Sequence, residues 1–243
     1  MKKIICIYSL ISAFNLTSQV WFDFGLNGSV GSGFYMGKSF YSDSRFNVVP
    51  QLNNTVALKV GVNPSEKHSV VIELGYANRA YAMDQALIPG KDENDVFTQQ
   101  LFFSGFQGAL LYRNTNEGSF IEVGPMINSI SSQSLSDQAS SLTSQPSFIT
   151  DKSVRGVFGF GGYVLGSERV TLVAGLRFLY DFSDLRSINS DGELVSFPFY
   201  NYNEKTLNQP LHALDVQFNL ELNVSLGFLA RASCGKRKVV FEW

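Results

Sequence analysis

The chain has 243 residues and a formal net charge of −2, so it lacks the basic surface that binds nucleic acid. Charged residues make up 16% of the sequence, against about 25% in an ordinary soluble domain. Phenylalanine and glycine each occur 21 times. This composition indicates a chain that exposes little charged surface.

Residues 1–18 have the pattern of a signal peptide. Two lysines follow Met1, the apolar run Ile4–Phe14 is too short to cross a bilayer as a helix, and a short polar stretch ends at Ser18. Cleavage after Ser18 removes Cys6 and leaves Cys234 without an intramolecular disulfide partner. No later segment is apolar for long enough to form a transmembrane helix, so an exported, charge-poor chain would cross a membrane as a closed barrel.

Apolar and polar residues alternate with a period of two in eight segments, which is typical of strands with one apolar face. The predicted strands are Val20–Phe34, Val48–Val62, His68–Met83, Thr98–Tyr112, Ser119–Ser129, Ser153–Leu165, Val170–Ser183 and Leu214–Phe228. Both faces of the fourth segment contain apolar residues. There we expect Phe102 and Phe106 to face outward, because this places Gly105 and Gln107 inward.

The connections between these strands alternate in length. The short ones are predicted at Asn63–Lys67, Arg113–Gly118 and Gly166–Arg169, and the long ones at Tyr35–Asn47, Ala86–Phe97, Ile130–Lys152 and Asp184–Pro210. Short periplasmic turns and long outer loops are typical of outer-membrane barrels. The sequence therefore predicts an all-β fold, an eight-stranded antiparallel up-and-down transmembrane β-barrel over residues 19–230. Both termini are expected in the periplasm, and outer-membrane lipid and lipopolysaccharide are the expected surroundings.

The predicted inward face carries charges of both signs. These residues are Lys59, Glu73, Arg79, Glu122, Arg155, Arg177, Asp181, Asp215 and Glu221. An eight-stranded barrel is only wide enough inside to be filled by side chains, and buried charges must be paired. We expect a network of ion pairs that fills the lumen; the alternative is a narrow polar path for small ions.

The sequence contains little that indicates catalysis. The two histidines are His68, after a predicted periplasmic turn, and His212, at the outer start of the last strand with Asp215 on the opposite face. No metal-ligand spacing and no phosphate-binding loop occur, so no cofactor, metal site or enzyme activity is expected. A catalytic His212 in a lipid-modifying enzyme is the alternative.

Two segments are candidates for partner binding. The long connection over residues 184–210 contains an aromatic cluster, Phe197, Phe199, Tyr200 and Tyr202, which either covers the barrel mouth or contacts a protein or glycan partner. Residues 231–243 are interpreted as a periplasmic C-terminal tail whose alternating Val239, Phe241 and Trp243 are candidates for recognition during assembly.

Three segments resemble small outer-membrane barrels that are common in Bacteroidota, the PorT-like group among OmpA- and OmpX-like barrels. These are Phe120–Pro125, the glycine-rich Val157–Leu165 and Leu172–Leu185, in which an arginine precedes an aromatic-rich outer end. The resemblance implies an eight-stranded barrel, and one branch of that group serves protein secretion and gliding.

Three functions follow as hypotheses. The first is a filled outer-membrane barrel with a structural, adhesive or partner-binding role through its outer loops. The second is an accessory component of a type IX-like secretion or gliding machinery. The third is a lipid-modifying outer-membrane enzyme.

Overall fold

The computed structural model describes residues 21–37, 46–86, 96–137, 150–167, 169–186 and 210–226. Its strands are β1 (Trp21–Met36), β2 (Phe46–Val49), β3 (Gln51–Asn63), β4 (His68–Ala86), β5 (Val96–Asn116), β6 (Ser119–Asp137), β7 (Lys152–Gly166), β8 (Val170–Asp181) and β9 (His212–Leu226). Within these ranges no helix is long and apolar enough to cross a membrane, a finding that does not bear on β-barrels.

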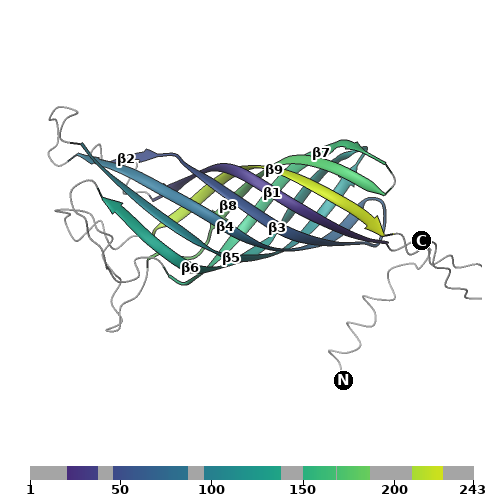
Figure 1. Cartoon of the computed structure of the whole chain (residues 1–243), viewed down its shortest axis with the longest axis horizontal. Helices are drawn as coiled ribbons and strands as arrows, with labels where there is room; N and C mark the ends of the chain where they lie inside the picture. Colours follow the sequence, from purple (N-terminus) through teal and green to yellow (C-terminus); the bar gives the residue numbers. More distant parts are fainter. Residues whose placement is uncertain are drawn as a thin grey trace, which may run out of the picture.

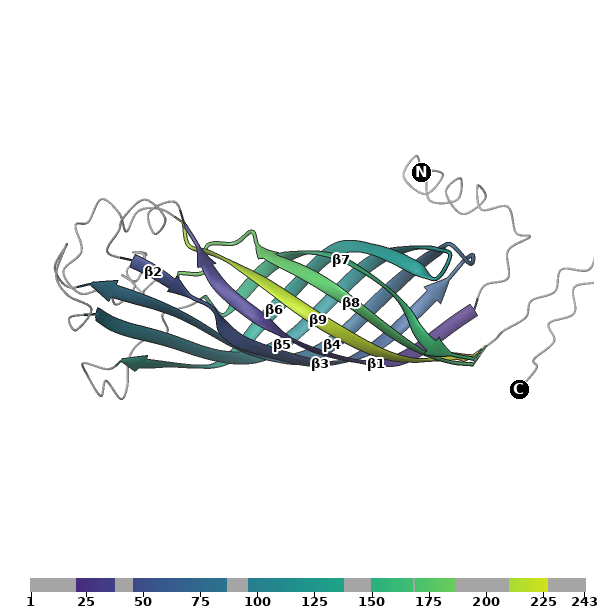
Figure 2. The same ribbon diagram turned by 90° about the horizontal axis from the view of Figure 1, so that it is seen from above.

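Eight of these strands close into a barrel. Every neighbouring pair is antiparallel, in the order β4-β3-β1-β9-β8-β7-β6-β5, and a further pairing of β5 with β4 closes the ring. The first and last strands pair along nearly their whole length, from Phe22 opposite Leu226 to Met36 opposite His212. The closed cylinder is seen from two sides in Figures 1 and 2. The predicted eight-stranded antiparallel barrel is confirmed.

The register fixes the tilt of the strands. A row of directly paired residues can be followed once around the barrel from β4 back to β4. It runs His68, Asn114, Ile121, Phe160, Leu176, Phe218, Val30, Asn54, Asn78. The row returns to β4 ten residues beyond its start, at Asn78 instead of His68. With ordinary strand spacings this stagger over eight strands corresponds to a tilt of about 40°, which is usual for barrels.

The two ends of the barrel differ. At the short-turn end, which also holds Trp21 and Leu226, Glu117 and Gly118 form a two-residue turn with φ of 47° and 82°. Positive φ at both positions is the geometry of a type I′ hairpin turn. The prediction that Arg113 belongs to this turn is wrong, because β5 continues to Asn116 before the chain reverses.

Strands β4, β5 and β6 extend furthest toward the opposite, long-loop end (Figure 1). The prediction of a loop from Ile130 is wrong in part, since β6 runs on to Asp137. Pro50 interrupts the predicted second strand, because proline lacks the N–H that a sheet ladder needs. The preceding piece, β2, pairs with β4 from Phe46 to Val49.

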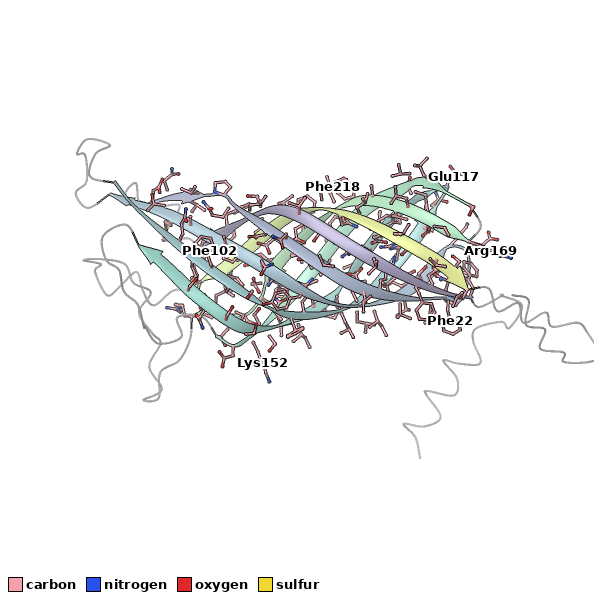
Figure 3. All side chains as sticks on the ribbon, in the orientation of Figure 1. Phe22, Phe102, Glu117, Lys152, Arg169 and Phe218 are labelled. Atoms are coloured by element: carbon pink, nitrogen blue, oxygen red, sulfur yellow. The ribbon has the colours of Figure 1, made fainter. Side chains whose placement is uncertain are left out.

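Side chains alternate between the outside and the lumen as the periodicity predicts. In β5, Phe102 and Phe106 are exposed on the outside, whereas Gly105 and Gln107 are buried inside. Figure 3 shows side chains along both visible edges of the barrel, with Phe218 midway along it. Apolar residues on this layer are not covered by any other part of the described structure.

The outward apolar side chains of β4 form a band with polar residues at both edges. On β4 the band covers Val70–Tyr76 and lies between the polar His68 and Asn78. These two residues are ten apart, which is about 33 Å along a strand and about 25 Å along the axis of a barrel whose strands tilt by about 40°. That height matches the apolar band of about 25 Å on transmembrane barrels.

Candidate functional site: the charged lumen

Six charged side chains from six strands meet in the half of the lumen nearer the short-turn end. This lower cluster consists of Lys59, Glu73, Arg113, Glu122, Arg177 and Glu221. All six are at most 4% exposed. Because inward positions recur at every second residue, each strand places its charge in the lumen, and the apolar residues on either side of it in the sequence face outward.

Two arginines connect the carboxylates of the lower cluster. Arg177 donates two hydrogen bonds of 2.7 Å to the two oxygens of Glu73 and one of 2.5 Å from Nε to Glu122. Arg113 donates to Glu122 at 2.7 Å and to Glu221 at 2.6 Å. Paired donors of this kind suit the planar guanidinium group, and they link strands that lie across the lumen from each other.

Glu221 has the most cationic partners of the cluster. Besides Arg113 it accepts a hydrogen bond of 2.6 Å from Lys59 Nζ, and Arg177 Nη2 lies 3.3 Å from its Oε1. The Arg113 guanidinium also lies 4.1 Å from the centre of the Phe120 ring, a cation–π contact. The lower cluster is therefore one continuous network.

A second, upper cluster lies nearer the long-loop end and consists of Arg79, Arg155, Asp181 and Asp215. Arg155 donates to Asp181 at 2.7 Å from Nε and to Asp215 at 2.5 Å from Nη1. The Tyr81 hydroxyl accepts from Arg155 at 2.8 Å and donates to Asp215 at 2.8 Å. Tyr81 thus provides a further hydrogen-bond donor to the Asp215 carboxylate, which is fully buried.

The two clusters are each electrically neutral. Three cations face three carboxylates in the lower cluster and two face two in the upper cluster. All nine charged residues assigned to the lumen from the sequence lie in these clusters, but that set holds four cations and five carboxylates. Arg113 is the missing cation. Arg113 has an odd number, like the inward-facing Gln107, so the alternation places it on the inward face. The excess of one carboxylate in the predicted set also indicated that a cation was missing.

Apolar layers separate and cover the clusters. Met126, Val157 and Leu179 belong to a buried group between the clusters on β6, β7 and β8, completed by Val71, Ala109 and Leu111. Above the upper cluster, Tyr35, Tyr81, Leu101, Phe103, Leu185, Leu211 and Ala213 form a second buried group. The upper cluster therefore has buried apolar side chains on both sides, which exclude water from its ion pairs and strengthen them.

The segment 182–186, which we call the strap, places Leu185 in this upper apolar group. The Leu185 amide donates to the Leu211 carbonyl at 2.9 Å, and the Thr150 amide donates to the Leu185 carbonyl at 3.0 Å. Asp184 accepts hydrogen bonds from the Leu211 amide at 3.1 Å and from the Arg186 side chain. Burial alone would raise the pKa of the Asp184 carboxyl, but these hydrogen bonds hold its pKa below the ordinary value.

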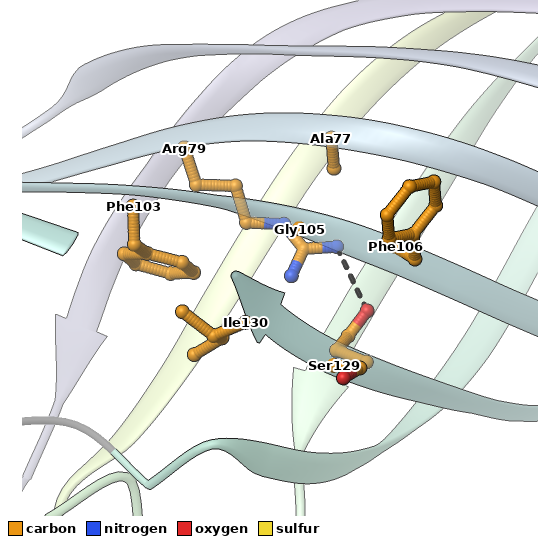
Figure 4. Close-up of a pocket in the computed structure, with 8 residues that line it drawn as sticks. Ala77, Arg79, Phe103, Gly105, Phe106, Ser129 and Ile130 are labelled. Carbon is orange, nitrogen blue, oxygen red and sulfur yellow. Dashed lines mark hydrogen bonds between the residues drawn. The ribbon is translucent and has the colours of Figure 1, made fainter. Parts of the chain in front are cut away.

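A cavity of about 10 Å³ lies beside Arg79, where a bulge shifts the register between β5 and β6 at Ser104 and Gly105. Figure 4 shows the Arg79 guanidinium directed toward β6, where it donates to Asn128 at 3.2 Å. A space of this size holds one water molecule at most.

The histidines do not form a catalytic arrangement in the described residues. His212 stacks on Tyr180, and its Nδ1 donates to the Asp181 carbonyl at 2.9 Å, whereas Asp215 points into the lumen. His68 stacks on Tyr112 and lies 2.6 Å from its hydroxyl. No group of three or more candidate metal ligands occurs in the described ranges.

Several predictions fall outside the described residues. These are the signal peptide 1–18, the aromatic loop residues Phe197, Phe199, Tyr200 and Tyr202, the closing Phe228, and the tail 231–243 with Cys234. They remain predictions.

No model of a known protein family matches this chain, and no curated protein matches its sequence. Among solved structures, it is similar to Neisserial surface protein A, with a TM-score of 0.40, 10% identity, and coverage of 82% of this chain and 96% of that one. It is also similar to OprG from Pseudomonas aeruginosa, with a TM-score of 0.38, 9% identity, and coverage of 87% and 97%. Ail of Yersinia pestis, in a complex with the heparin analogue sucrose octasulfate, gives a TM-score of 0.35, 8% identity, and coverage of 83% and 98%. These likenesses are distant, and the barrel is defined by its own strand pairing.

Proposed function

We propose that this protein is an integral outer-membrane barrel with a filled lumen that acts at its long-loop end in a structural, adhesive or partner-binding role. The observation that carries the proposal is the outward apolar band, whose polar edges at His68 and Asn78 are separated by about 25 Å of barrel height. A lipid environment removes the cost of exposing so many large apolar side chains, and the closed ring leaves no unpaired sheet edge in the band.

The interior supports a filled barrel and not a channel. Ion pairs of 2.5–2.7 Å cross the lumen at two levels, and each cluster is neutral, so neither attracts a mobile ion of one sign. Opening a path would require separating buried charges from their partners, at about 3–5 kcal/mol for each broken pair.

The long-loop end is the expected place of action. Beyond Asn78, β4 continues for eight residues to Ala86, which is about 20 Å of barrel height above the band. This extension and the long connections offer contact surface outside the membrane. Both chain ends of the described barrel, Trp21 and Leu226, lie at the other end, which we assign to the periplasm.

Cysteine labelling on intact cells tests this assignment. In a Cys234→Ala background, Ser134→Cys places a thiol on the extended part of β6, and Glu117→Cys places one in an exposed short turn. We expect a membrane-impermeant maleimide to label Ser134→Cys in intact cells and Glu117→Cys only after the outer membrane is opened. Labelling of both in intact cells, or recovery of the protein in the soluble fraction, would contradict the proposal.

An accessory role in type IX-like secretion is the second candidate, favoured by the PorT-like resemblance of Phe120–Pro125 and Leu172–Leu185. Co-purification with one large complex in mild detergent would support it. A lipid-modifying activity is disfavoured because His212 is held by a backbone carbonyl and stacked on Tyr180, with no carboxylate partner among the described residues. We expect His212→Ala to leave lipid turnover in the membrane unchanged.

A further inference from the structure

Four polar residues lie side by side on the outside of β3, β4, β5 and β6. This polar row consists of Asn54, Asn78, Ser104 and Ser132, which are direct partners in the register. The Asn78 amide donates to Asn54 Oδ1 at 3.1 Å, and the Ser104 and Ser132 hydroxyls are 2.7 Å apart. The row lies near the long-loop edge of the apolar band, which Asn78 marks on β4, while the exposed Leu52 and Phe102 lie beyond it on β3 and β5. In a membrane this places the row close to the lipid headgroups.

An aromatic pair lies directly below the polar row. Tyr76 and Phe106 are register partners whose rings meet edge to face at 5.3 Å, and Phe106 is 65% exposed. The Tyr76 hydroxyl donates to Ser104 Oγ at 2.8 Å, so the aromatic pair and the polar row form one continuous surface. A bulge at Ser131 adds a further hydroxyl, which donates to the Ser104 carbonyl at 3.1 Å.

The charge on this surface is low. None of the four residues of the polar row is ionisable. Among the described residues, the nearest outward cation is Lys152 of β7, which is the register partner of Ser129. Hydroxyl and amide groups both donate and accept hydrogen bonds, which matches the hydroxyls of a sugar. The negative faces of aromatic rings attract the C–H groups of a sugar ring. A phosphate would instead select a cluster of cations.

We infer that the polar row and the Tyr76–Phe106 pair bind the sugar headgroup of a glycolipid in the leaflet at the long-loop end. The sugar hydroxyls contact Asn78 and Ser104, one face of the sugar lies on Phe106, and the acyl chains run down the apolar band past Val56 and Leu74. Lys152, at the end of this surface, accommodates an anionic substituent on the sugar. This inference rests on the proposed membrane insertion.

Lipid retention in nanodiscs tests it. The barrel is inserted into nanodiscs of phosphatidylethanolamine with small equal fractions of a monogalactosyl lipid and phosphatidic acid, then released, and the lipids that remain bound are weighed by native mass spectrometry. We expect the galactolipid to be enriched about three- to tenfold over phosphatidylethanolamine, as one or two net hydrogen bonds imply. Asn78→Ala with Ser104→Ala should abolish the enrichment, and Phe106→Leu should reduce it while keeping the band apolar.

Ser32→Ala is the matched control, because Ser32 also faces outward near this edge but lies on β1, away from the aromatic pair. We expect it to behave as the wild type. No galactolipid enrichment in the wild type, equal loss in Ser32→Ala, or equal enrichment of phosphatidic acid would each overturn the inference. Failure of the barrel to insert into nanodiscs would instead overturn the proposed function.

Discussion

Replacing Arg113 with methionine tests the charge-balanced lumen most directly. Arg113 is 3% exposed and contacts two carboxylates, with its shortest hydrogen bonds at 2.6 Å to Glu221 and 2.7 Å to Glu122. Methionine fills much of the volume but leaves three carboxylates with two cations. Removing one partner from a buried ion pair costs about 3–5 kcal/mol, so we expect Arg113→Met to lower the free energy of unfolding by about that amount.

The double variant separates charge from packing. Arg113→Met with Glu221→Gln restores neutrality, with two cations facing two carboxylates. We expect it to be more stable than the sum of the two single changes predicts, with a coupling energy of about 1–3 kcal/mol. Urea unfolding of barrels folded in lipid vesicles, followed by tryptophan fluorescence, measures all four proteins. Strictly additive losses, or a loss below about 0.5 kcal/mol in Arg113→Met, would refute the argument that neutrality of the cluster stabilises the barrel.

Four further predictions follow from other parts of the structure. Planar-bilayer recordings of the wild type should show no steady conductance. The double variant Arg113→Ala with Arg177→Ala should show ion leakage, because it removes two side chains that cross the lumen. Steady conductance in the wild type would contradict the filled lumen. Gly31→Ala should lower the folded yield, because the added Cβ would collide with the Val216 carbonyl of β9. Gly28→Ala is the control and should fold like the wild type, because no atom lies within 4 Å of the added Cβ. Equal yields of the two variants would show that the close approach of Gly31 to β9 is unimportant. Because the pKa of Asp184 is lower in the folded state, its contribution to holding the strap is complete above the ordinary aspartate pKa of about 3.9 and is lost as the pH falls through the lower folded-state value. The protection factor of the Leu185 amide, which corrects for the pH dependence of intrinsic exchange, should therefore fall in acid in the wild type and be low at every pH in Asp184→Asn. Gly118→Ala should destabilise the hairpin of β5 and β6 by about 1 kcal/mol, since φ of 82° disfavours a side chain, and unchanged stability would refute that assignment.

The sequence predicted the alternation between the outward apolar face and the lumen. Alternation is strict wherever one face is apolar and outward and the other faces the lumen, so the orientation of Phe102 and Phe106 was predicted correctly. Where both faces meet water the constraint disappears, and the serine-rich end of β6 beyond Ile130 therefore looked like a loop. Pairing across strands, such as Tyr81 with Asp215, depends on the stagger of the barrel, which no single strand encodes.

Arg113 shows how a site residue was missed. The stretch from Arg113 to Gly118 is rich in turn-forming residues, yet the actual reversal uses only Glu117 and Gly118, and the remaining residues continue the strand. The position of a charge relative to the lumen depends on this boundary, and turn composition alone places boundaries poorly.

The seam between β1 and β9 also constrains how the protein is made. On one side β1 pairs with β3, but its partner on the other side is β9, from His212 to Leu226, which follows all the other described strands in the sequence. Without β9, β1 and β8 each have an unpaired edge and the sheet is open. A chain that ended before β9 would therefore remain an open sheet with two unpaired edges, which are templates for pairing with other chains.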